Sequence, residues 1–184
     1  MRIITGRAKG IRLQTLEGND TRPTSERSKE AVFSMLQFEI EGRAVLDLFA
    51  GSGQLGLEAI SRGARCAHLV DGGRAAIEII KKNVAKCRFE NEVSIHNEDA
   101  LSFLKRQSGA QKYGIVFLDP PYASDLIDQA LTLLYNKELI KDTSYIVCES
   151  DRFDILGLEN SEKYDIIKHM KHGVAHISVL KLKK

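Results

Sequence analysis

The stretch VLDLFAGSGQLG, at residues 45–56, constrains the fold of this chain more than any other feature. Its apolar start predicts a buried strand over 44–48, and its end opens a predicted helix over 55–62, which Gly63 ends. The turn between them consists of glycines and other small residues, which let a backbone approach a ligand where any Cβ would collide. A strand, a glycine turn and a helix N-terminus in this order predict a nucleotide-type binding corner.

The rest of the chain alternates between short apolar runs and segments with helical spacing of apolar residues. Strands are predicted at 66–70, 93–96, 113–118 and 145–148, and helices at 26–39, 74–87, 100–106 and after Ser124. This alternation predicts an α/β fold with a mostly parallel sheet and helices on both faces. Two late strands, 164–170 and 175–182, are predicted to pair as an antiparallel hairpin. Right-handed crossovers would bring the strand carboxyl ends to one edge, where ligands bind in such folds.

The N-terminal residues combine two short apolar runs with a concentration of positive charge. Arg2–Thr5 and Ile11–Thr15 are joined by a glycine-flanked segment, which predicts a β-hairpin. Residues 1–29 carry +4 and residues 163–184 carry +5, whereas residues 30–162 carry −7. Basic ends on an acidic body are compatible with a polyanionic partner such as nucleic acid, and also with ends that are merely solvated. The candidate RNA contacts are Arg2, Arg7, Lys9, Arg12, Arg22 and Arg27.

Composition narrows the class of protein further. The 184 residues suit one domain with at most a small appendage, and the hydrophobic content of 43% suits a sizeable core. No apolar run has the length of a membrane span or a signal peptide, so we expect a cytoplasmic protein without a membrane partner. Cys66, Cys87 and Cys148 form no Cys-x-x-Cys pair, which predicts reduced thiols rather than a zinc site or a disulfide framework.

The glycine turn matches the pattern of a dinucleotide site, Gly51-x-Gly53-x-x-Gly56, with Asp71 twenty residues after the first glycine. An acid at the end of the second strand can accept hydrogen bonds from the ribose of NAD or of S-adenosylmethionine. Three features favour S-adenosylmethionine. Asp47 suits a ligand with an ammonium group, Asp99 can accept from an adenine amine, and the chain has little room for a separate substrate domain.

A second motif, Asp119-Pro120-Pro121-Tyr122, follows the fourth predicted strand of the sheet. Two prolines fix the backbone and remove two amide donors, so acceptors are left to face a ligand. The Asp119 carboxylate and the Pro120 carbonyl, held side by side, suit an exocyclic amine with two N–H groups. Tyr122 offers a ring on which a base can stack, worth ~1–3 kcal/mol. These features predict chemistry on the amine of a nucleobase.

Together, residues 45–56 and 119–122 resemble the class I S-adenosylmethionine-dependent amino-methyltransferases. Two N-terminal signatures make the resemblance more specific, RIITG with Lys9-Gly10, and Arg22-Pro23-Thr24 with Arg27 and residues 30–33. With them, nearly the whole chain resembles the RsmD-type family of 16S rRNA guanine-N2 methyltransferases. One departure is Gly73, where the family usually has Asp or Asn, which weakens the cap of the following helix.

The resemblance implies a Rossmann-like seven-stranded sheet whose last strand is antiparallel, and methyl transfer to the N2 amine of a guanine in 16S rRNA. It implies a basic arm at 1–22 and a methyltransferase domain at 23–184, in a monomer that uses no metal. The assembling small ribosomal subunit is a candidate partner. The catalytic residues implied are Asp119, Pro120, Pro121 and Tyr122. The cofactor-binding residues implied are Asp47, Phe49, Ala50, Gly51, Ser52, Gly53, Asp71, Asp99 and Ala100.

Three other functions are compatible with the same residues. An adenine-N6 methyltransferase acting on DNA or RNA could use the same acceptors, although a DNA reader would often carry a further domain. An NAD-dependent oxidoreductase could use the glycine pattern. An RNA-binding module without catalysis is the third, and the intact Asp119–Tyr122 motif speaks against it.

Overall fold

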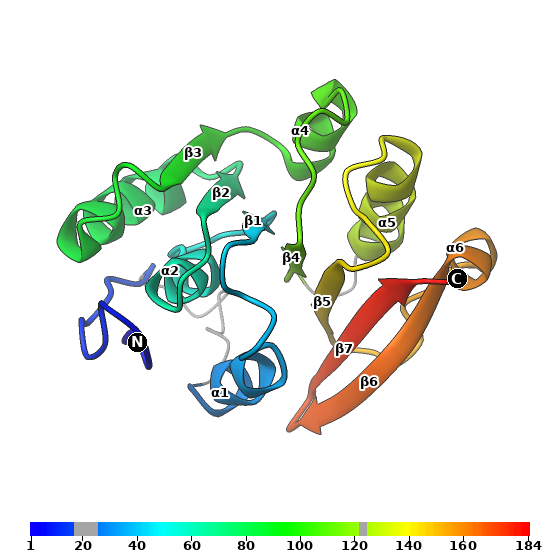
Figure 1. Ribbon diagram of the computed structural model, residues 1–184, viewed down its shortest axis with the longest axis horizontal. Helices are drawn as coiled ribbons and strands as arrows, with labels where there is room; N and C mark the ends of the chain where they lie inside the picture. The colour runs from blue at the N-terminus through cyan, green and yellow to red at the C-terminus, as the bar shows by residue number, and fades with distance from the viewer. Residues whose placement is uncertain (17–25, 122–124) are drawn as a thin grey trace.

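A computed structural model describes residues 1–16, 26–121 and 125–184, and within these ranges the strands form one seven-stranded sheet of order β3-β2-β1-β4-β5-β7-β6 (Figure 1). Strands β1 to β5 are parallel, and β7 is antiparallel to both of its neighbours. The predicted α/β sheet with an antiparallel last strand is therefore confirmed. The strand bounds are β1 Ala44–Asp47, β2 Cys66–Asp71, β3 Val93–Asn97, β4 Ile115–Leu118, β5 Tyr145–Ser150, β6 Tyr164–His172 and β7 Ala175–Leu182.

Helices cover both faces of this sheet, as the alternation of strands and helices predicts (Figure 1). One face packs against α1, α2 and α3, and the other against α4, α5 and α6. Successive side chains of β1 point to opposite faces of the sheet. Val45 packs in the core on the side of α1, α2 and α3, and Leu46 packs in the core on the side of α4 and α5. The helix bounds are α1 Glu26–Met35, α2 Gln54–Ser61, α3 Arg74–Cys87, α4 Ala100–Arg106, α5 Leu126–Asn136 and α6 Leu158–Lys163.

Two helices differ from the sequence prediction. The helix expected over 26–39 ends at Met35 and continues as a turn, and α6 was not predicted. Ser124, after which the sequence predicts a helix, lies outside the described residues, and the observed helix is α5. Helix α6 has only six residues, two of them glutamates, and its short polar sequence carries too little apolar spacing to show a period.

The N-terminal arm, residues 1–16, forms the predicted hairpin in an irregular way. Only Arg2 and Arg12 form a β-bridge, and backbone hydrogen bonds also join Ile3 to Ile11 and Leu13 to Met1. The arm packs against the domain, because Ile3, Ala8 and Leu13 are buried in the core with α1 and α2. At the arm's turn Gly6 has φ +85°, and a Cβ there would lie 1.8 Å from the Ser61 carbonyl oxygen. Only glycine allows the arm this close to α2.

A buried carboxylate on α2 holds the arm in place. Glu58 is fully buried and accepts hydrogen bonds from the backbone N–H groups of Ile4 (2.8 Å) and Thr5 (3.0 Å). It also pairs with Lys29 (3.2 Å) and Arg62 (2.8 Å). Lys29 is equally buried, and it donates to a backbone carbonyl of the arm at 2.6 Å. Burial lowers the pKa of Lys29, although the charge of Glu58 opposes the shift. Such a pair specifies one position for the arm.

Two further features concern membrane-spanning segments and the cysteines. Among the described residues, no helix combines the length and the apolar character needed to cross a bilayer. Cys66, Cys87 and Cys148 are free thiols, as predicted. Burial raises the pKa of Cys87 and of Cys148, which makes these thiols unreactive.

Replacement of Glu58 tests how much the buried pair contributes to folding. Glu58→Gln leaves the Lys29 ammonium buried without a counter-charge, so we expect a loss of about 3–5 kcal/mol in the free energy of unfolding. Urea unfolding followed by circular dichroism measures it. The control is Glu78→Gln, at an exposed residue paired with Lys81 on α3, which should unfold at the wild-type urea concentration. Equal midpoints for the two variants would contradict a structural role for Glu58.

Candidate functional site

The glycine turn between β1 and α2 forms an open corner at the carboxyl edge of the parallel strands. Gly51 and Gly53 have φ +54° and +78°, a conformation that side chains disfavour. The turn is held by hydrogen bonds from the Ala50 N–H to the Val70 carbonyl (2.9 Å) and from the Gly53 N–H to the Ala50 carbonyl (2.7 Å). A Cβ added at Gly51 would meet no atom within 4 Å, so the space above this residue is open to a ligand.

The third glycine of the pattern has a packing role. A Cβ at Gly56 would lie 2.2 Å from Leu69 Cδ2, so a larger residue there would require the buried Leu69 side chain to move. The Gly56 N–H donates to Asp47 Oδ2 at 3.0 Å. Asp47 is only 2% exposed, beneath the start of α2. Burial raises the pKa of Asp47 to about 7; the Gly56 hydrogen bond opposes this shift and the nearby Asp71 adds to it.

Asp71 lies at the end of β2 and faces the glycine turn. Its Oδ2 accepts from the Gly51 N–H and its Oδ1 from the Gly73 N–H, both at 2.8 Å. Gly73 precedes α3 without a side-chain cap, and a Cβ there would approach Asp71 Oδ1 to 3.2 Å. Since each carboxylate oxygen has two lone pairs, both oxygens can still accept a hydroxyl. Glycine at position 73, where the family usually has Asp or Asn, therefore leaves Asp71 in place beside the corner.

The remaining predicted cofactor residues lie at the same edge. Asp99 is exposed after β3 and accepts from the Ser102 N–H (2.9 Å), which caps α4. Ala100 is the buried first residue of that helix, and Phe49 is half-buried against the core under α4 and α5. Ser52 is half-buried within the glycine turn. The corner is thus lined from β1, β2 and β3.

Asp119 follows β4, which pairs directly with β1, so the second motif lies beside the glycine turn. Asp119 is half-buried, Pro120 is buried and Pro121 is exposed. Tyr122 lies outside the described residues. The end of β4 separates two concavities. One of them is lined by Val32, Leu55, Phe117, Leu118, Asp119, Val147, Glu149 and Ile177.

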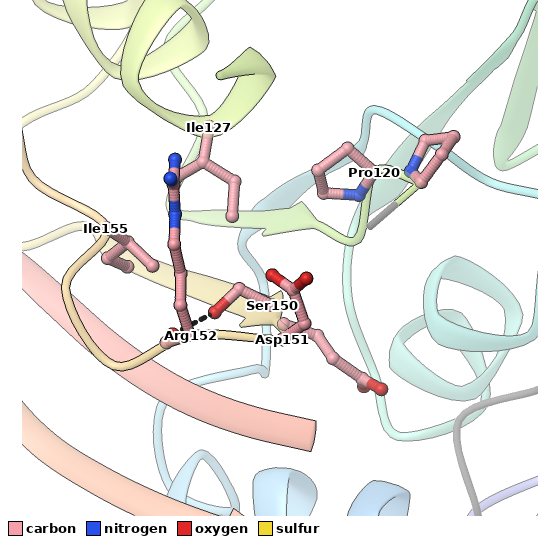
Figure 2. Close-up of a pocket in the computed structure, with 8 residues that line it drawn as sticks. Pro120, Ile127, Ser150, Asp151, Arg152 and Ile155 are labelled. Atoms are coloured by element: carbon pink, nitrogen blue, oxygen red, sulfur yellow. Dashed lines mark hydrogen bonds between the residues drawn. The ribbon is translucent and has the colours of Figure 1, made fainter. Parts of the chain in front are cut away.

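The other concavity lies on the α5 side of the motif, where Pro120 faces the segment that follows β5 (Figure 2). Ser150 and Arg152 line it, and the Ser150 hydroxyl donates to the Arg152 carbonyl at 2.5 Å. Glu149, at the end of β5, lines both concavities. Sequence reasoning missed Glu149, although the rule that ligands bind at strand carboxyl ends applies equally to β5. The full lining is Pro120, Pro121, Ile127, Glu149, Ser150, Asp151, Arg152 and Ile155.

The predicted RNA-binding side chains are exposed, but they do not form a single cluster around the site. Arg7 pairs with Glu92 (2.6 Å) and lies over the Phe89 ring (4.5 Å). Glu92 directly precedes β3, so Arg7 lies toward the amino ends of the parallel strands, away from Asp119. Arg2 lies 3.6 Å from Glu26 at the start of α1. Lys9, Arg12 and Arg27 are also exposed, and Arg22 lies outside the described residues.

The described residues contain no group of three or more His, Cys, Asp or Glu side chains that could hold a metal ion. The side chains at the strand ends are instead hydrogen-bond acceptors, namely Asp71, Asp119 and Glu149. Such an arrangement can bind the hydroxyls of a ribose and the amine of a base.

Comparisons with known proteins agree with this geometry. The sequence profile of the family described as Conserved hypothetical protein 95, Cons_hypoth95, matches residues 1–181. Ribosomal RNA small subunit methyltransferase D of Haemophilus influenzae is 34% identical over 95% of this chain and 90% of that protein. Its namesake from Escherichia coli strain K12 is 36% identical over 82% of this chain and 75% of that protein. The solved structure of Escherichia coli yhhF superposes with a TM-score of 0.86 at 31% identity, covering 100% of this chain and 98% of that one.

The raised pKa of Asp47 makes stability depend on pH. This carboxyl ordinarily titrates near 3.8, and in the folded protein near pH 7, so the folded state binds the proton more tightly. Its contribution to stability is fully present below about pH 4 and is lost as the pH rises through about 7. Asp47→Asn removes this contribution. We therefore expect the free energy of unfolding of the variant to fall less steeply than that of the wild type between pH 4 and 7.

Urea unfolding at fixed ionic strength across this pH range measures the difference. The control is Asp142→Asn, which makes the same charge change at an exposed residue and should follow the wild-type slope. Parallel curves for the wild type and Asp47→Asn would show that Asp47 is ionised in the folded state at all these pH values.

Proposed function

The chain belongs to the Cons_hypoth95 family, the RsmD family of rRNA methyltransferases, and on that premise we propose that it transfers a methyl group from S-adenosylmethionine to the N2 amine of a guanine in 16S rRNA. The observation that carries this proposal is the position of Asp119-Pro120 beside the glycine turn, because it sets two acceptors for an amine next to a nucleoside corner. The substrate is the 16S rRNA, either free or in the assembling small subunit, and the enzyme acts as a monomer.

The residues of the corner fit the cofactor. The open space above Gly51 admits a ligand against the backbone, and Asp71 lies beside it with lone pairs for the two ribose hydroxyls. Asp99 and Ala100 lie at the end of β3, where the adenine would bind. Asp47 acts from beneath, because its Oδ2 accepts from the Gly56 N–H, and above about pH 7 its ionised carboxylate supplies negative charge below a ligand with an ammonium group. When bound, S-adenosylmethionine supplies a methyl group on a positively charged sulfur that leaves as a neutral thioether.

The acceptors after β4 prepare the amine for attack. The lone pair of a guanine N2 amine is delocalised into the ring, which makes the nitrogen a poor nucleophile. Hydrogen bonds to the Asp119 carboxylate and the Pro120 carbonyl favour a pyramidal nitrogen and stabilise the positive charge that develops as the N–C bond forms. The same contacts fix the direction of approach and lower its entropic cost. The nitrogen then loses one proton, to Asp119 or to water, which leaves the neutral methylated amine.

The target guanine must leave any base-paired stack to reach these acceptors. Flipping a base costs a few kcal/mol in a duplex and less in a loop. Tyr122, which follows the prolines in sequence, would stack on the extruded base. Arg27 on α1 and the basic residues of the arm, Arg2 among them, would contact the phosphates of the surrounding RNA.

A methyl-transfer assay tests both the proposed function and the role of Asp119. With labelled cofactor and 16S rRNA, we expect N2-methylguanosine as the only labelled nucleoside. Asp119→Ala should lower the single-turnover rate by about 100-fold or more, because it removes an acceptor that strengthens in the transition state. Its affinity for S-adenosylhomocysteine should change by less than about threefold, since the carboxylate contacts the amine and not the nucleoside.

Asp151→Ala is the matched control, because Asp151 lines the neighbouring concavity but lies outside the motif. Labelled N6-methyladenosine would replace the guanine proposal with the adenine alternative. A near wild-type rate for Asp119→Ala would assign this carboxylate a structural role only.

A second prediction concerns the basic arm. Arg7 and Lys9 are exposed on its turn, and RNA phosphate contacts give an affinity that falls with salt. Arg7→Ala with Lys9→Ala should weaken rRNA binding and reduce the slope of log affinity against log salt by about 1–2, at about 0.7–0.9 per lost phosphate contact.

The control is Lys105→Ala with Lys141→Ala, which makes the same charge change at exposed residues outside the arm, on α4 and before β5. Filter binding across a salt series measures both double variants. If the arm variant keeps the wild-type slope and loses thermal stability instead, the pairing of Arg7 with Glu92 serves only to dock the arm.

A further inference from the structure

Asn83 of α3 connects the N-terminal arm to the glycine turn, two segments that lie far apart in the sequence. We propose that Asn83 is a positioning residue that couples docking of the N-terminal arm to the shape of the glycine turn, so that cofactor binding and arm docking strengthen each other. The proposal rests on the proposed function in one respect, which is that the glycine turn is the cofactor site.

The contacts of Asn83 carry the inference. Its side chain is fully buried, and its Oδ1 accepts from the Gln14 N–H of the arm at 2.8 Å. Its Nδ2 donates to the Gln14 carbonyl at 2.9 Å and to the Ser52 carbonyl of the glycine turn at 2.8 Å. The amide has two N–H groups, and one holds the arm while the other holds the turn. Among the described residues, no other side chain is seen to bond to both segments.

The Ser52 carbonyl is a sensitive point of the turn. Ser52 lies between Gly51 and Gly53, the two residues with positive φ, so the peptide groups around it have more freedom than an ordinary backbone. The peptide that joins Ser52 to Gly53 is held on both sides, because its N–H donates to the Ala50 carbonyl and its carbonyl accepts from Asn83. Of these two bonds, only the one from Asn83 also connects the turn to a residue that binds the arm.

Coupling follows from the shared amide. If the arm leaves its place, the Asn83 Oδ1 and one N–H lose their partners in a buried site, and the side chain gains freedom to turn away from Ser52. If a ligand orders the turn, Asn83 is held in the orientation that binds Gln14. Because linkage is reciprocal, the factor by which arm docking tightens cofactor binding is the factor by which cofactor tightens arm docking. Contact between the arm and RNA would in this way change the affinity of the glycine turn for the cofactor.

The test compares Asn83→Asp with Ser61→Ala in the full chain. Asparagine to aspartate keeps the size of the side chain and the acceptor for the Gln14 N–H, but it removes the donors to Gln14 and Ser52. Ser61 is the matched control, because its hydroxyl is buried, accepts from the Ala8 N–H (3.0 Å) and donates to the Thr5 carbonyl (2.6 Å). The Ser61 side chain therefore bonds to the arm at two points, both of them away from the glycine turn.

Calorimetry with S-adenosylhomocysteine gives the first readout. We expect Asn83→Asp to weaken binding about tenfold, which corresponds to about one lost buried hydrogen bond, and Ser61→Ala to change it by less than about twofold. Thermal unfolding identifies any variant that has lost its fold. Equal affinities of the wild type and Asn83→Asp would overturn the coupling, as would an equal loss in both variants, which would indicate general destabilisation of the arm.

Hydrogen exchange gives a second readout that needs no variant. In the wild type, S-adenosylhomocysteine should slow exchange of the Gln14 amide, which lies in the arm and outside the corner. Ser61→Ala should keep this response and Asn83→Asp should lose it. An unchanged Gln14 exchange rate in wild-type protein that binds the ligand overturns the coupling alone. Wild-type protein that binds no S-adenosylhomocysteine overturns the proposed function together with the inference.

Discussion

The close contact between helix α2 and strand β2 at Gly56 is the constraint on which the rest of the structure depends. A Cβ there would lie 2.2 Å from Leu69 Cδ2 and would displace this fully buried side chain. The contact sets the start of α2 over the buried Asp47 and so determines the glycine turn. Further along, the same helix presents Glu58 and Ser61 to the N-terminal arm. The position of this one helix therefore affects both the glycine turn and the place of the arm.

The sheet topology brings the acidic residues of the site together. Strand β1 lies between β2 and β4. The connection that follows β1 leads to β2 on one side, and the connection that follows β3 returns to β4 on the other side. The two connections diverge at the carboxyl end of β1 and open a crevice there. Asp71 ends β2 on one side of this crevice, and Asp119 follows β4 on the other. Glu149 follows on β5, and it lines both concavities that flank the motif. The acceptors thus lie in the order in which a nucleoside and a reacting amine would need them.

Buried polar groups in this protein specify position more than they add stability. Glu58 and Lys29 are withdrawn from water, which offsets much of their mutual attraction, yet each also binds the backbone of the arm. Asn83 does the same between the arm and the glycine turn. An arm held only by Ile3, Ala8 and Leu13 could slide on an apolar surface, whereas directional bonds permit a single register.

The sequence by itself determined the strands, most helices, the glycine corner and the free thiols, because these follow from local spacing of apolar residues and from the backbone freedom of glycine. It also placed Asp71 and Asp119 at strand ends, since parallel strands share one edge. Only the tertiary structure decided that Asp47 is buried with a raised pKa, that Arg7 pairs with Glu92 away from the site, and that Asn83 joins the arm to the turn. Burial, and pairing between residues as distant in sequence as Arg7 and Glu92, which are 85 positions apart, arise from packing, and no local pattern in a single sequence records them.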